Sequence, residues 1–149
     1  MSCAAAAAAF LWLAAMPPMA ADAISQTPAS PAGAVALEPL FADIVARAGR
    51  LKAEADAARK AGQAPPADFA EAIRQLANLD MQGHVLLKAR GTDGDLKCIL
   101  KGISEDLPLK LAAMQAAASP AARDDALAEM GYLLNDNVEV ITAPPKPPV

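Results

Sequence analysis

The stretch MQGHVLLKARGTDGDLKCILKGIS, residues 81–104, contains two segments with apolar residues at helical spacing. Gly91 suits the left-handed conformation that ends many helices, and Asp93 suits the position that begins one. A connection this short folds the second segment back along the first. The stretch therefore predicts a helical hairpin, and the rest of the chain can be arranged around it.

Helical spacing of apolar residues extends on both sides of this hairpin. The first predicted helix runs from Pro39 to Gly62, and the second runs from the Pro65-Pro66 pair to Arg90. The third runs from near Asp95 to Met114 with a kink at Pro108. The fourth begins at Ser119-Pro120 and its apolar pattern fades at residues 135–137. Alanine is abundant and aromatic residues make up only 3% of the 149 residues, which favours closely packed helices over a sheet. Similar helix lengths and short connections predict an all-α fold, an antiparallel up-down-up-down four-helix bundle over residues 38–141.

The N-terminal segment has the order of a secretory signal peptide. Residues 4–16, AAAAAAFLWLAAM, are apolar but shorter than the roughly 20 residues that span a bilayer. Pro17-Pro18 and the small-x-small site Ala21-Asp22-Ala23 follow, although no Lys or Arg precedes the apolar run. We expect residues 1–23 to be removed by cleavage near Ala23. The mature chain is then periplasmic or secreted and has no transmembrane helix.

Two further segments lack a pattern of apolar residues that would make them fold. Residues 24–37 are rich in Ser, Pro, Gly and Ala, the composition of a flexible linker. Residues 142–149 form a Pro-rich tail that is typical of extended chain. The sequence therefore predicts disordered N- and C-terminal segments on either side of the bundle.

Charge and motifs exclude several functions. The formal net charge is −4 with acids and bases interspersed, which argues against nucleic-acid binding through a basic face. The sequence contains no identifiable Ser/His/Asp order, no Gly-rich phosphate loop and no Cys-x-x-Cys-His motif. We therefore expect no catalytic site, no metal site and no cofactor, and we do not expect an enzyme.

The hairpin holds the only histidine, His84, and Cys98, the only cysteine left after cleavage. Rotation by about 100° per residue places Cys98 on the back of its helix and His84 on the flank of the preceding helix, so they do not converge. A zinc site usually needs four ligands, or three and a water. Asp80 precedes His84 by one helical turn, and we predict a structural Asp80–His84 pair instead of a shared metal site.

Apolar or small residues also lie away from the main stripes of the hairpin. They are Met81 and Val85 on the second helix and Cys98, Gly102 and Leu109 on the third. One interpretation is an interface with a protein partner or a second copy, and the other is that these residues join the core of bent helices. An odd cysteine in an exported protein is a buried thiol, a reactive thiol or an intermolecular disulfide.

These patterns favour an exported helical-bundle protein that acts by binding or as a scaffold. Its partner is an unknown protein or a second copy, contacted through the surface that carries Cys98. The alternative is a periplasmic ligand or metal carrier that uses His84, Met81 and Cys98.

Overall fold

A computed structural model describes residues 34–91 and 94–143. The helices are α1 (Pro39–Ala61), α2 (Phe69–Arg90), α3 (Gly94–Gln115) and α4 (Pro120–Thr142), preceded by a short 3-10 helix, η1 (Val35–Leu37). The prediction of an all-α four-helix bundle is confirmed. The predicted signal peptide (1–23), most of the predicted linker (24–37) and most of the predicted tail (142–149) lie outside the described residues.

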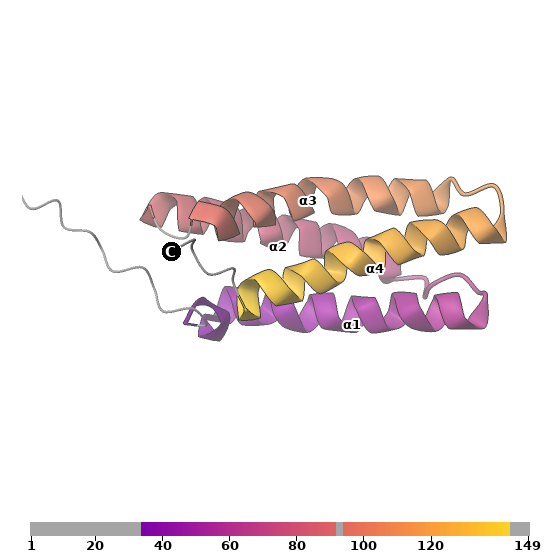
Figure 1. Cartoon of the computed structure of the whole chain (residues 1–149), viewed down its shortest axis with the longest axis horizontal. Helices are drawn as coiled ribbons and strands as arrows, with labels where there is room; N and C mark the ends of the chain where they lie inside the picture. Colours follow the sequence, from indigo (N-terminus) through magenta and orange to yellow (C-terminus); the bar gives the residue numbers. More distant parts are fainter. Residues whose placement is uncertain (1–33, 92–93, 144–149) are drawn as a thin grey trace, which may run out of the picture.

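The four helices form a closed ring of neighbours. Each helix begins at the end of the bundle where the preceding helix finishes, so successive helices run in opposite directions (Figure 1). Contacts join α1 to α2, α2 to α3, α3 to α4 and α4 back to α1. In this arrangement α2 and α4 lie diagonally across the core.

Local signals account for most helix ends. Gly62 and Gly91 follow α1 and α2 with φ angles of 64° and 67°, the left-handed conformation that costs glycine little. At the start of α4, the Ser119 hydroxyl accepts a hydrogen bond of 3.1 Å from the Ala122 N–H. Helix α3 continues through Pro108 even though proline has no N–H to bond the preceding turn.

Three boundaries differ from the sequence prediction, and one of them is the start of α2, which begins at Phe69 and not at the Pro65-Pro66 pair. Helix α4 does not fade at residues 135–137 but continues to Thr142. Asn137 is fully buried and Ile141 is in the core, so tertiary packing holds a polar run in the helix that would be weak alone. Val35 is only 6% exposed and packs in the core, so the folded region begins inside the segment predicted as a linker.

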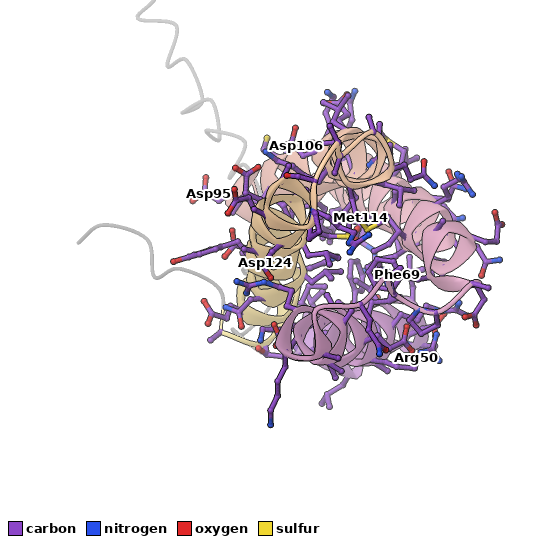
Figure 2. All side chains as sticks on the ribbon, turned by 90° about the vertical axis from the view of Figure 1, so that its right-hand side faces the viewer. Arg50, Phe69, Asp95, Asp106, Met114 and Asp124 are labelled. Carbon is purple, nitrogen blue, oxygen red and sulfur yellow. The ribbon has the colours of Figure 1, made fainter. Side chains whose placement is uncertain are left out.

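The core is a single cluster of apolar side chains from all four helices. Seen along the bundle, Phe69 and Met114 point between the helices, whereas Arg50, Asp95 and Asp106 lie at the perimeter (Figure 2). The largest fully buried side chains include Phe41, Ile44, Leu51, Phe69, Ile73, Leu76, Leu87, Leu100, Leu107, Leu127, Met130 and Leu134.

None of the helices in the described ranges is both long and apolar enough to cross a membrane.

Candidate functional site

The predicted interface residues lie on α2 and α3 with different exposures. Leu109 is 65% exposed, Val85 is 57% exposed and the Cys98 thiol is free and exposed. Gly102 and Met81 are half-buried. The alternative that these residues join the core does not hold for Leu109, Val85 or Cys98. Each of the two helices therefore carries one large exposed apolar side chain. We call these five residues the hairpin surface.

Gly102 leaves space on α3. A Cβ atom built at Gly102 would meet no heavy atom of the protein within 4 Å. Gly102 follows Cys98 by one helical turn, so a partner backbone can approach α3 closely beside the exposed thiol.

A groove with a volume of about 510 Å³ lies between α2 and α3, beside Met81. Its lining combines apolar groups with polar side chains: Arg74, Ala77, Asn78, Met81, Ser104, Pro108, Leu111, Ala112 and Gln115. Because Pro108 has no N–H, the Ser104 carbonyl lacks its usual helical donor.

His84 is held by α3 and not by its own helix. Its Nδ1 lies 2.7 Å from the Lys97 carbonyl oxygen. Because a carbonyl can only accept, Nδ1 carries a proton and donates it to the Lys97 carbonyl oxygen. The bond places the His84 ring against the α3 backbone one residue before Cys98.

Asp80 does not pair with His84, which corrects the sequence prediction. Both Asp80 and Asn137 are 0% exposed, and the Asn137 Nδ2 donates to the two carboxylate oxygens of Asp80 at 3.0 and 2.9 Å. Burial raises the pKa of Asp80 to about 7, an effect that the hydrogen bond from Asn137 partly opposes. Asp80 precedes His84 by four residues, which is close enough for a contact along one helix. However, Asp80 points into the core whereas His84 turns toward α3.

Asn137 is a residue that sequence reasoning missed. It lies on the apolar stripe of α4 at spacings of four, three and four, in the series Met130, Leu134, Asn137 and Ile141. An asparagine at a core position of a helical stripe needs a polar partner in the core. That signal was present in the sequence, but it could not identify Asp80 as the partner.

Ion pairs link other neighbouring helices. Arg90 donates to both carboxylate oxygens of Glu38 at 2.8 and 2.7 Å, and these bonds hold the pKa of Glu38 below its usual value. Arg59 donates to Asp124 at 3.1 and 3.3 Å, which joins α1 to α4. By contrast, within residues 34–91 and 94–143 no ion pair joins α2 to α3.

The described residues contain no group of three or more His, Cys, Asp or Glu side chains placed to hold a metal ion. His84 and Cys98 belong to facing helices, but the thiol is exposed while the imidazole bonds to the backbone. The geometry therefore adds no observation in favour of a carrier that uses His84, Met81 and Cys98.

No protein-family model matches the chain, and no curated protein and no solved structure matches it.

Proposed function

We propose that the protein is an exported binding or scaffold protein that docks a protein partner, or a second copy of itself, on the hairpin surface. The supporting observation is the exposure of Val85 and Leu109, two large apolar side chains on adjacent helices. Single exposed apolar residues are common on soluble proteins, but the same two helices also carry an open glycine, an exposed thiol and a groove lined by Met81.

Export is the part of this proposal that rests on the N-terminal sequence. Trp12 is the only tryptophan, and it precedes the expected cleavage site near Ala23. Protein recovered from the periplasm or medium of an expressing cell should therefore lack tryptophan fluorescence. Its intact mass should match that of a chain that begins after residue 23. Recovery of a chain that retains Trp12 would contradict the proposed processing.

The binding role is tested by charge substitutions on the hairpin surface. Val85→Glu and Leu109→Glu should each weaken association about five- to 150-fold in analytical ultracentrifugation or pull-down titration, because burying a carboxylate at an apolar contact costs about 1–3 kcal/mol of binding free energy. Leu37→Glu is the matched control, since Leu37 is 85% exposed and lies on η1, outside the hairpin. The control should leave association unchanged.

Cys98 provides a second readout. Non-reducing gels of the exported protein should show a dimer that disappears with reductant and in Cys98→Ser. A monomer that carries a co-purifying metal or chromophore would instead favour the carrier alternative and contradict the docking role.

A further inference from the structure

Asp80 and Asn137 form a polar contact inside an otherwise apolar core. They come from α2 and α4, which face each other diagonally and are not neighbours in the ring. Both residues are 0% exposed, and the two bonds between them measure 3.0 and 2.9 Å. This contact is the only side-chain hydrogen bond across the centre of the bundle in the described residues.

The hydrogen-bond capacity of this pair is not satisfied when Asp80 is ionised. A carboxylate has about four acceptor sites, yet the Asp80 oxygens share one amide nitrogen. The Asn137 Oδ1 is also buried and has no donor. An ionised group with so few donors is costly in a core, because the energy of hydration is not replaced.

No other helix supplies a compensating charge. Among the described residues, the side chains that α1, α3 and α4 bury are apolar except for Ser104 and Asn137, and the Ser104 hydroxyl donates to the Lys101 carbonyl. On α2 itself, the titratable residue closest to Asp80 in sequence is His84, whose Nδ1 bonds to the Lys97 carbonyl. Asp80 therefore lies in the core with Asn137 as its polar partner and without a cation.

We propose that Asp80 carries a proton in the folded protein below neutral pH, and that this buried proton is a structural element whose loss destabilises the bundle as the pH rises toward neutral. The proton turns one carboxyl oxygen into a donor. A rotation of the Asn137 amide then lets Oδ1 accept from that oxygen, while Nδ2 keeps its bond to the other oxygen. One proton thus satisfies the oxygen that is otherwise left without a partner.

The sign of the pH dependence follows from the two states of Asp80. The pKa of Asp80 is about 7 in the fold, against its ordinary value of 3.8 when the side chain is solvated in the unfolded chain. Between these values the folded state holds a proton that the unfolded state has released to solvent, so stability decreases as pH rises from about 4 to about 7. Below pH 4 both states are protonated and the contribution is fully present. Above pH 7 both states are ionised and it is lost.

The first experiment measures the proton directly in the intact chain. The carboxyl carbon of Asp80, assigned by ¹³C labelling, should titrate near pH 7 in the native protein. A carboxyl that is already ionised at pH 5 would overturn the proposal, and this readout does not depend on any variant folding.

The second experiment measures unfolding by urea at half-unit steps from pH 4 to 8. The unfolding equilibrium constant of the natural chain should increase by up to about tenfold per pH unit inside the window of pH 4 to 7, as expected for one proton. Asp80→Asn replaces the carboxyl by a neutral amide of similar size and should remove this contribution. Asp136→Asn, which removes an exposed carboxylate on α4, should retain it. Equal pH dependence in the natural chain and Asp80→Asn would overturn the proposal.

Discussion

Replacing Phe41 by alanine is expected to lower the free energy of unfolding by about 3–5 kcal/mol. Phe41 is 0% exposed and is one of the two largest side chains that the described core contains. Removing the ring forfeits the free energy gained by transferring it from water into the core. It also leaves a cavity that neighbouring helices can close only partly. Since a domain of this size is usually stable by about 5–15 kcal/mol, the variant should fold but unfold at a much lower urea concentration.

The measurement is urea unfolding followed by circular dichroism in the helical band, with and without the substitution. Leu37→Ala serves as the control, because Leu37 is apolar, close to Phe41 in sequence and 85% exposed. Its free energy of unfolding should change by no more than about 0.5 kcal/mol. A loss below about 1 kcal/mol for Phe41→Ala would mean that the ring does not fill the core as the structure shows.

Replacing Gly83 by valine should destabilise the bundle by about 1–3 kcal/mol, because it adds atoms to a core position that is already filled. A Cβ atom built at Gly83 would lie 3.1 Å from both Leu100 Cδ1 and Phe41 Cε1, and 3.6 Å from Ile44 Cδ1. Valine adds two methyl groups beyond this crowded position, so the Leu100 and Phe41 side chains must shift or α2 must move away from α1 and α3. Thermal or urea unfolding measures the cost.

Gly102→Val is a matched control because it adds the same side chain to a helical glycine with open space around it. This control should not destabilise the chain. A double-mutant cycle sharpens the test, since Gly83→Val should cost less in the Phe41→Ala background, where the ring no longer occupies the space. Additive effects would show that the crowding comes from another source.

The helices were predictable because their signals are local. Gly91 ends α2, Ser119 caps α4 and apolar spacing marks the buried faces, and each of these acts within a few residues. Short connections between helices of similar length then leave the antiparallel bundle as the natural arrangement. Pro108 was compatible with a continuous helix because the apolar spacing runs through it.

The boundaries of the fold depend on contacts that are distant in sequence. Residues 135–137 look like the end of a helix by composition, but the burial of Asn137 against Asp80, 57 positions earlier, keeps α4 intact. Val35 looks like part of a linker until its packing against the core is known. Local propensity cannot include either contribution.

In the candidate site, too, local features could be predicted from the sequence and contacts between helices could not. Rotation at helical spacing correctly describes Cys98 as a residue on the outside of α3. The partner of His84 could not be inferred in this way, because the Lys97 carbonyl belongs to the facing helix and competes with any side chain on α2. Pairing rules within one helix rank neighbours by sequence distance and do not include acceptors on another helix.

The contact between α1 and α4 has a consequence for chain connectivity. Because η1 packs against both α1 and α4, the described segment starts and finishes at the same end of the bundle (Figure 1). A short linker from residue 143 to residue 34 could therefore close the chain into a circle, and a new opening in the exposed connection at residues 63–68 would give a circular permutant with the same four neighbours. What defines this fold is the cyclic order of its helices, and the place where the chain is cut is secondary.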